Sequence, residues 1–252
     1  MLSALPRPTI FAHRGSSAHA PENTLAAFKL AIEHQADAIE LDAKLSLDQV
    51  PVVIHDQTVD RTTQGTGEVR QMTLAELREL DAGEFFDSTF RGEKIPTLEE
   101  VFETVGKRIF INIELTNYAS PGDPLPYIVA ELVRKHGLEG QVLFSSFNPL
   151  ALLRVRKVLP QVPRGLLALP GASGAWARSW LRRFVPCEAI HPEYQDITPR
   201  FVQRIHRAGQ RIHAYTVNQQ EDMRRLFGMG VDGIFTDDPL LARQILAEVS
   251  AG

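Results

Sequence analysis

Short apolar runs alternate with amphipathic segments along most of the chain. The apolar runs predict buried strands at residues 10–13, 38–45, 109–115, 142–146, 164–168, 189–191, 211–217 and 233–236. Helices are expected to begin near residues 21 and 97 and to cover about 125–136, 149–158, 175–184, 199–208, 219–227 and 239–248. Such alternation indicates a parallel sheet covered by helices. Eight repeats favour a closed (β/α)8 TIM barrel over an open sheet, since no Gly-x-Gly-x-x-Gly follows the first strand.

One region interrupts this alternation. Residues 51–54 form an extended arm after the second strand, and residues 57–94 follow with turn-rich sequence and a single short helix at 74–80. That stretch is too long for a plain connection and too short to build a core of its own. We therefore predict one barrel domain over residues 1–252, with a small insertion at about 57–94 after strand 2.

Composition and charge narrow the function classes. The chain is 44% hydrophobic and 23% charged, as in ordinary globular proteins, and its net charge is −4 without a block of lysines and arginines. These values argue against nucleic acid as a partner. The single cysteine, Cys187, excludes an intramolecular disulfide and a cysteine metal cluster.

The membrane and the secretory pathway also lack signals in the sequence. Residues 1–9 do not have the basic flank and apolar run of a signal peptide. No segment reaches the ~18 uninterrupted apolar residues that span a membrane. We therefore expect a cytoplasmic protein without stable membrane insertion, and the pattern predicts no particular oligomeric state.

Ionisable residues stand where the first three strands end. They are His13, Arg14, Glu40, Asp42, His55 just beyond the arm, and Glu114. Glu40 and Asp42 are two positions apart, so they project from the same face of a strand. Neighbouring carboxylates repel each other unless a cation lies between them. Because barrels carry their active sites at the carboxyl ends of the strands, we predict that these residues form one site.

The residue types predict a division of labour within that site. Glu40, Asp42 and Glu114 suit one hard divalent cation, Mg²⁺ or Ca²⁺. The planar fork of Arg14 suits a phosphate group. His13 and His55 can serve as acid and base near neutral pH, and together these groups predict hydrolysis of a phosphate ester. Taken singly, an acid could form a surface ion pair and His13 could be a core histidine, so the prediction rests on their convergence.

Several sequence motifs resemble those of the glycerophosphodiester phosphodiesterases. The matching segments are Ala12-His13-Arg14-Gly15, Pro21-Glu22-Asn23-Thr24, Glu40-Leu41-Asp42, Val53-Ile54-His55-Asp56, Asp60-Arg61-Thr62-Thr63, Gly65-Thr66-Gly67, Thr73-Leu74 with Glu76-Leu77, Ile95-Pro96-Thr97-Leu98, Tyr215-Thr216-Val217-Asn218, Gly230-Val231-Asp232-Gly233-Ile234 and Thr236-Asp237. The resemblance spans almost the whole chain, and the motifs agree in order and spacing.

The resemblance implies a (β/α)8 barrel with an insertion after strand 2 and a small-molecule glycerophosphodiester substrate. It implies divalent-metal-dependent cleavage to sn-glycerol 3-phosphate and an alcohol. By position, Glu40, Asp42 and Glu114 match the metal ligands and Arg14 the phosphate-binding arginine. His13 and His55 match the acid–base pair. A free glycerol hydroxyl is expected to attack the phosphate first, giving a cyclic phosphate that water then opens.

Two positions depart from the family's pattern. The family usually has a lysine where this chain has Thr116, and often a tryptophan where it has Tyr215. We hypothesise that Lys44, on the same strand face as Glu40 and Asp42, partly replaces that lysine at the phosphate. The alternative is a solvated lysine at the rim of the barrel. Tyr215 is expected to line the substrate pocket.

An aromatic segment in the second half of the chain raises another possibility. Trp176, Trp180 and Phe184 are four apart in the helix expected at 175–184, interleaved with three arginines: Arg178, Arg182 and Arg183. They could form a lid that meets an apolar or anionic substrate or a membrane surface, or they could pack on the barrel as in an ordinary helix. The other functions open at this point are a phosphodiesterase acting on lysophospholipids or phosphoinositides and a non-catalytic barrel that binds phosphate esters.

Overall fold

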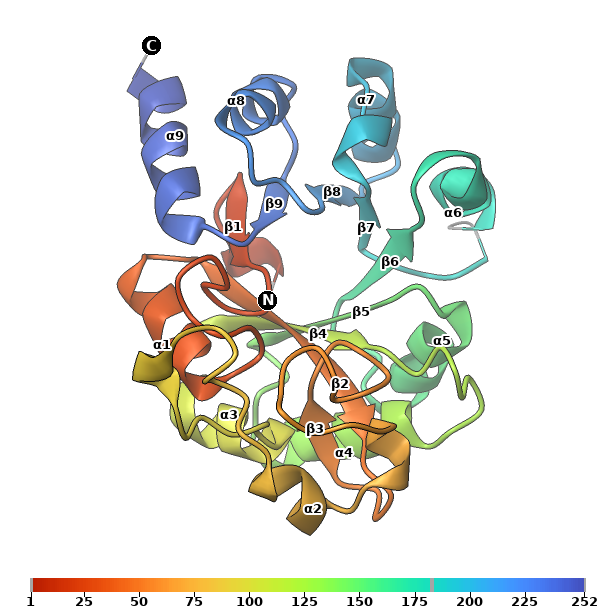
Figure 1. Cartoon of the computed structure of the whole chain (residues 1–252). Coiled ribbons are helices and arrows are strands. Elements are labelled where there is room, and N and C mark those ends of the chain that lie inside the picture. The colour runs from red at the N-terminus through yellow and green to blue at the C-terminus, as the bar shows by residue number, and fades with distance from the viewer. Residues whose placement is uncertain (1, 182–183, 252) are drawn as a thin grey trace.

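The computed structural model describes residues 2–181 and 184–251, and its centre is a closed barrel of eight parallel strands (Figure 1). The strands are β1 (Thr9–Ala12), β2 (Ala38–Leu45), β4 (Phe110–Leu115), β5 (Val142–Ser146), β6 (Arg164–Ala168), β7 (Ala189–Pro192), β8 (Arg211–Ala214) and β9 (Gly233–Thr236). Each strand pairs in parallel with the next in this order, and β1 closes the ring by pairing with both β2 and β9. The predicted (β/α)8 barrel is confirmed.

Helices surround the barrel, and most of them begin at side-chain caps. They are α1 (Leu25–Glu33), α2 (Leu74–Glu79), α3 (Leu98–Val105), α4 (Leu125–Lys135), α5 (Pro149–Val158), α6 (Ala175–Arg178), α7 (Pro199–Arg207), α8 (Gln220–Gly228) and α9 (Pro239–Ala251). Thr24 caps α1, while Thr97 and Glu100 form a reciprocal capping box at α3. In the described residues no helix is long and apolar enough to cross a membrane.

The hydrophobic core lies between the strands and the helices, because alternate strand residues point outward. Leu41, Ile111 and Phe144, for example, are fully buried in the largest apolar cluster, which α1, α3, α4 and α5 cover. The inward-facing positions differ, since several of them carry polar or ionisable groups such as Glu40, Asn112 and His191. The outward face of the barrel therefore stabilises the fold, and the inward face provides the chemistry.

The region between β2 and α3 forms a separate small unit on the barrel. The arm β3 (Pro51–Val53) pairs antiparallel with β2 outside the ring. Residues 57–94 then contain α2 and the short 3-10 helices Val69–Gln71 and Ser88–Phe90. Their apolar side chains, including Val59, Val69 and Leu77, pack with Val52 of β3 and with Ile95. The segment thus packs on β3 and lies beside the end of β2.

Two expected elements are shorter in the structure by more than a residue or two. β8 ends at Ala214, where residues up to 217 were expected, and the expected helix 175–184 is reduced to α6, Ala175–Arg178. The α6 helix ends at Arg178. The next residue, Ser179, donates its hydroxyl to the carbonyl of Ala175 and so competes with the hydrogen bonds of the helix. Arg182 and Arg183 lie outside the described residues.

Candidate active site

A cavity of about 210 Å³ opens at the carboxyl ends of the barrel strands. Its lining includes the ionisable residues predicted from the strand ends, namely His13, Arg14, Glu40, Asp42, His55 and Glu114, together with Tyr215. The structure therefore brings these seven predicted residues together. Lys44 lies beside this group but faces a neighbouring cavity.

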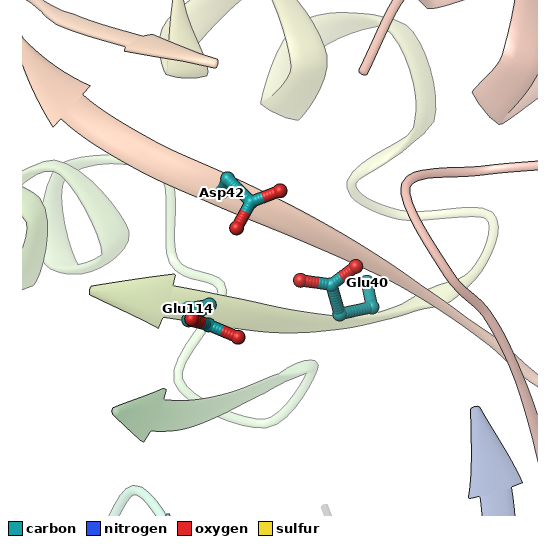
Figure 2. A group of neighbouring side chains, drawn as sticks. All are labelled: Glu40, Asp42 and Glu114. Atoms are coloured by element: carbon teal, nitrogen blue, oxygen red, sulfur yellow. The ribbon is translucent and has the colours of Figure 1, made fainter. Parts of the chain in front are cut away.

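Three carboxylates form the most compact group in the cavity. Asp42 of β2 lies directly across from Glu114 of β4, and Glu40 is two residues before Asp42 on the same face. Figure 2 shows the three side chains turned toward one another from the two neighbouring strands. One oxygen from each lies within 4.8 Å of the others. This is the kind of oxygen-rich cluster that holds a hard divalent cation.

The electrostatics of the cluster support the same interpretation. Burial, followed by the negative charges of Asp42 and Glu114, raises the pKa of Glu40 well above its ordinary value. Burial and the charge of Asp42 likewise raise the pKa of Glu114 to about 7. The charged forms are therefore disfavoured without a cation between them. The donor set fits Mg²⁺ or Ca²⁺, as predicted, since it consists of carboxylate oxygens.

A sharp backbone turn positions Arg14 beside two of these acids. Arg14 has a left-handed φ of 55°, and Gly15 follows with φ 85° at a point where a Cβ would lie 2.7 Å from Ala27. The turn directs the Arg14 N–H to Glu40 at 2.8 Å and its guanidinium Nε to Asp42 at 3.4 Å. The Nη1 group donates to Glu22 at 2.9 Å. A cationic fork is thus held at the edge of the acidic cluster.

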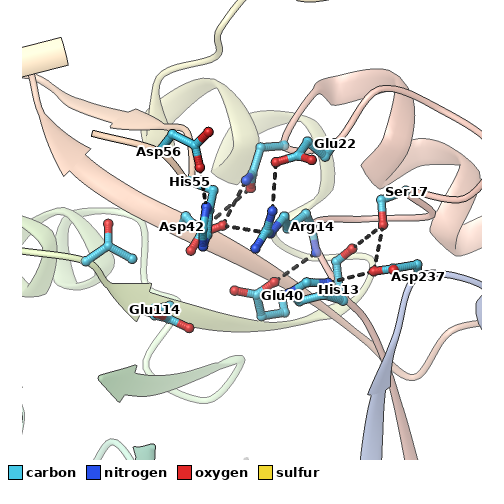
Figure 3. A network of polar contacts seen from close by, with 12 residues as sticks. His13, Arg14, Ser17, Glu22, Glu40, Asp42, His55, Asp56, Glu114 and Asp237 are labelled. Carbon is cyan, nitrogen blue, oxygen red and sulfur yellow. Dashed lines mark hydrogen bonds and ion pairs between the residues drawn. The ribbon is translucent and has the colours of Figure 1, made fainter. Parts of the chain in front are cut away.

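Each of the two histidines is oriented by its own carboxylate (Figure 3). His13 Nδ1 is 2.6 Å from Asp237, and His55 Nδ1 is 2.7 Å from Asp56. An ionised carboxylate can only accept a hydrogen bond, so Nδ1 carries the proton in both rings and Nε2 is the nitrogen available for proton transfer. The hydrogen bonds from Arg61 lower the pKa of Asp56 to about 2, so this partner is ionised.

Comparisons with known proteins agree with this geometry. The sequence pattern of the glycerophosphoryl diester phosphodiesterase family matches residues 13–241. The chain belongs to this family. A glycerophosphodiester phosphodiesterase of Caldanaerobacter subterraneus is 43% identical over 231 residues, which are 91% of this chain and 94% of the relative. The predicted resemblance and the prediction of a phosphoric diester hydrolase are both confirmed.

Solved structures give the same answer for the fold. A phosphodiesterase of Oleispira antarctica, in complex with the product sn-glycerol-3-phosphate, has a TM-score of 0.87 and 33% identity, and the match covers 96% of this chain and 97% of that one. A glycerophosphodiester phosphodiesterase of Agrobacterium tumefaciens has a TM-score of 0.81 and 33% identity, with coverage of 94% and 99%. The barrel is thus the fold of solved phosphodiesterases.

The structure places Lys44 away from solvent. Its side chain is buried, with 5% of the residue exposed, so the alternative of a solvated rim lysine is wrong. The ammonium donates to the hydroxyl and the carbonyl of Thr116 at 2.9 and 3.2 Å. Burial lowers the pKa of Lys44, while the charges of Asp42 and Glu114 oppose that effect. A buried cation therefore lies next to the position that departs from the family's pattern.

Several residues around the site were not assigned roles from the sequence. Glu22, Arg61, Asp56 and Asp237 belong to motifs that match the family, which was the available signal, but only barrel closure brings them together. Arg61 donates to both Glu22 and Asp56, and so connects the partner of Arg14 with the partner of His55. Tyr118 belongs to no such motif.

The aromatic residues of the 175–184 segment do not pack on the barrel as an ordinary helix would. Trp176 is 37% exposed and Trp180 is 55% exposed, so that alternative is wrong. Phe184 is also exposed and contacts Trp180 edge to face. None of the three is among the residues described as lining the active-site cavity. The lid therefore stays a prediction.

Proposed function

We propose that this enzyme hydrolyses glycerophosphodiesters to sn-glycerol 3-phosphate and an alcohol, using one divalent cation and two histidines. The observation that carries this proposal is the convergence of three acids, two carboxylate-oriented histidines and one arginine in a single cavity. The product held by the Oleispira relative supports the choice of substrate class. The cytoplasmic location expected from the sequence stays a prediction.

The carboxylates of Glu40, Asp42 and Glu114 would hold the cation, Mg²⁺ or Ca²⁺. When bound, the cation supplies a Lewis acid that polarises the phosphoryl group and balances negative charge. The N–H of Arg14 keeps Glu40 turned toward its neighbours. Tyr118 does the same for Glu114, because its hydroxyl donates to that carboxylate at 2.6 Å.

Arg14 would bind the phosphate of the substrate. Its guanidinium carries five N–H donors. Nη1 donates to Glu22, while the buried Nε lies 3.4 Å from Asp42 and forms no hydrogen bond. The remaining donors can form charge-assisted hydrogen bonds with phosphate oxygens. Lys44 would add a second positive charge beside the cluster, which favours the charge that develops on the phosphoryl oxygens. This proposal for Lys44 rests on its burial near Asp42 and Glu114.

The two histidines would move the protons. One Nε2 takes the proton of the attacking hydroxyl, and the other gives a proton to the oxygen of the leaving alcohol. If the glycerol hydroxyl attacks first, the resulting cyclic phosphate is opened by water with the two roles exchanged. Asp56 and Asp237 keep both rings in the required tautomer, because each carboxylate accepts from Nδ1 and leaves Nε2 for proton transfer.

Identification of the reaction products tests this proposal. The enzyme is incubated with glycerophosphoethanolamine and Mg²⁺ or Ca²⁺, and phosphorus NMR follows the phosphorus species. We expect sn-glycerol 3-phosphate to accumulate, with a cyclic glycerol phosphate as a transient species. Absence of sn-glycerol 3-phosphate with either metal, across several glycerophosphodiesters, would contradict the proposal.

A lysophospholipid is the second candidate substrate, because Trp176, Trp180 and Phe184 are exposed. An acyl chain could contact these side chains while the phosphate enters the cavity. Replacing Trp180 and Phe184 with serine should then slow cleavage of lysophosphatidylcholine and spare that of glycerophosphoethanolamine. Equal rates of lysophosphatidylcholine cleavage in the wild type and in the doubly substituted variant would contradict this candidate.

A further inference from the structure

We infer that two aromatic rings in the cavity, those of Phe147 and Tyr215, form with the adjoining ring of Tyr118 a binding site for a cationic head group on the leaving alcohol. This inference deepens the proposed function and rests on it. The ligand we assign is a quaternary ammonium group such as that of choline. We call these three residues the aromatic wall.

The rings of the aromatic wall contact one another in a row, with Phe147 between the two tyrosines. The Phe147 centroid lies 5.7 Å from that of Tyr118 and 5.9 Å from that of Tyr215, with interplanar angles of 73° and 88°. Phe147 and Tyr215 both line the active-site cavity. Nearly perpendicular aromatic walls are the arrangement with which proteins bind quaternary ammonium groups.

Hydrogen bonds hold the two tyrosine rings in place and occupy their hydroxyl groups. The Tyr118 hydroxyl donates to Glu114 at 2.6 Å and accepts from the N–H of Phe147. The Tyr215 hydroxyl donates to the carbonyl of Ala168 at 2.7 Å. The ring surfaces, rather than the hydroxyl groups, are therefore left for a ligand, as a cation without hydrogen-bond donors requires.

The aromatic wall lies where the substituent of a bound phosphate would reach. Tyr118, Phe147 and Tyr215 follow β4, β5 and β8, whereas His13 and Arg14 follow β1. The Tyr118 hydroxyl donates to Glu114, so the wall begins at the acidic cluster, and Phe147 and Tyr215 continue it into the cavity. A diester whose phosphate lies between Arg14 and Glu114 would direct one of its two alcohols toward these rings.

Negative charge near the wall favours a cation over an apolar chain. Glu193 follows β7 and pairs with Tyr215 in an isolated parallel bridge. Its carboxylate accepts the N–H of Gln195 and forms no ion pair with the cationic side chains that the structure describes. Burial raises the pKa of Tyr215 most, the charges of Glu114, Glu193 and Asp196 add to this rise, and the charge of Arg178 opposes it.

The test compares two substrates that differ only in charge. In one, glycerophosphocholine, the alcohol ends in a trimethylammonium group, and in the other a tert-butyl group of the same shape replaces it. We expect the wild-type kcat/KM to be about fivefold to thirtyfold higher for the choline ester. Phe147→Leu and Glu193→Gln should each bring this ratio closer to one, while Phe147→Tyr should keep it.

A matched control comes from an aromatic pair outside the cavity. Phe86 is exposed in the insertion and contacts Phe90 edge to face at 5.7 Å, much as Phe147 contacts Tyr118. Phe86→Leu should leave the ratio unchanged. Equal kcat/KM values for the two substrates in the wild-type enzyme, or an unchanged ratio in both Phe147→Leu and Glu193→Gln, would overturn the inference.

A binding measurement separates this inference from the proposed function. Calorimetric titration of the His55→Ala variant, in which we expect turnover to be strongly reduced, with the two diesters measures the same preference as binding. Selective binding of the choline ester, with hydrolysis of neither compound by the wild type, would support the aromatic wall and contradict the proposed function. Hydrolysis of both with equal binding would contradict the aromatic wall alone.

Discussion

At the scale of single residues, Lys44 and Thr116 show how a charge can be supplied from a different strand. Thr116 follows β4 and carries no charge, but its hydroxyl and carbonyl hold the ammonium of Lys44 from β2. A cation buried beside Asp42 and Glu114 costs desolvation free energy, which the negative charges of these two acids offset in part. Lys44 and Thr116 therefore act as a unit, and substitutions can move the positive charge from one of these residues to the other.

We predict that Lys44→Ala lowers kcat about tenfold to a hundredfold, because a positive charge near the phosphoryl group is lost. Adding Thr116→Lys to this variant should recover part of the loss, since the new ammonium starts from the residue that held the old one. Steady-state kinetics of all three proteins give the answer. An unchanged turnover in Lys44→Ala would rule out this role of Lys44.

His55 offers a second test at this scale, with a close internal control. His55→Ala should reduce kcat by about a hundredfold or more because proton transfer is lost. His206 has the same side-chain exposure of 40% and also bonds an aspartate, Asp232, at 2.7 Å, but on α7. His206→Ala should therefore leave kcat unchanged. Near-full activity in His55→Ala would contradict the assigned mechanism.

The acidic cluster predicts how stability depends on pH. Glu114 has a pKa of about 7 in the folded protein against 4.5 as its ordinary value, so it binds its proton more tightly when folded. The unfolding free energy of the metal-free protein should consequently fall as the pH rises from about 4.5 to about 7. Mg²⁺ or Ca²⁺ should raise the melting temperature more at about pH 8 than at about pH 5.

Calorimetry with and without chelator measures this effect. Glu114→Gln removes the titrating group, so the metal-free variant should lose part of the decline in melting temperature across that pH range. It should also respond less to added metal. A variant with the same pH dependence and the same metal response as the wild type would contradict the assignment of Glu114 to the cluster.

Site residues were predictable where they lie on the inward face of a strand or directly follow one, because these positions meet at the mouth of a barrel. His13, Glu40, Asp42 and Glu114 are of this kind. Tyr118 was not predictable, since its place depends on a loop path that no hydrophobic pattern encodes. Lys44 was predicted near the site, but its hydrogen bonds to Thr116 depend on the register between β2 and β4.

At the scale of elements, the insertion contributes to the active site through Arg61. Its guanidinium bridges Glu22, the partner of Arg14, and Asp56, the partner of His55, with contacts of 2.7–2.8 Å. The shared arginine makes the phosphate-binding and proton-transfer groups depend on one side chain. We assign Arg61 as a positioning residue.

We predict that Arg61→Gln lowers kcat about tenfold to a hundredfold, because both Arg14 and His55 lose part of their support. Arg61→Lys should recover little, since an ammonium lacks the planar fork that reaches two carboxylates. The control is Arg78→Gln, because Arg78 lies in the same insertion and forms a two-contact pair with Glu100 away from the cavity. Similar kinetic losses in both glutamine variants would reduce Arg61 to a structural role.

Helices and strands have the bounds predicted from the sequence where the capping residues and the buried side chains favour the same bounds. The strands 142–146, 164–168 and 233–236 and the helix 149–158 have the expected bounds. The helix expected at 175–184 does not have them. Its aromatic residues at helical spacing suggested an apolar helix face packed on the barrel, but in the structure the barrel does not cover these residues. Arg178 there donates to Leu169, Gly171 and Asp196, and these contacts favour a compact loop over a longer helix.

At the scale of the whole molecule, barrel closure assembles the site. His13 and Asp237 are 224 positions apart in the chain and lie 2.6 Å apart in the structure because β1 pairs with β9. The alternation of strands and helices was sufficient to predict that closure. It was not sufficient to predict which carboxylate would support which histidine, since that depends on how neighbouring loops pack.

The central claim is that the carboxylates of Glu40, Asp42 and Glu114 hold a divalent cation on which phosphodiester cleavage depends. The most direct test is the initial rate of glycerol phosphate release from one glycerophosphodiester by the purified enzyme, measured before chelation, after chelation, and after return of Mg²⁺ or Ca²⁺. We predict activity that is lost with the metal and restored by it in the wild type, and no restoration in Asp42→Asn. Full activity in the chelated enzyme, or equal restoration in Asp42→Asn, would contradict the claim.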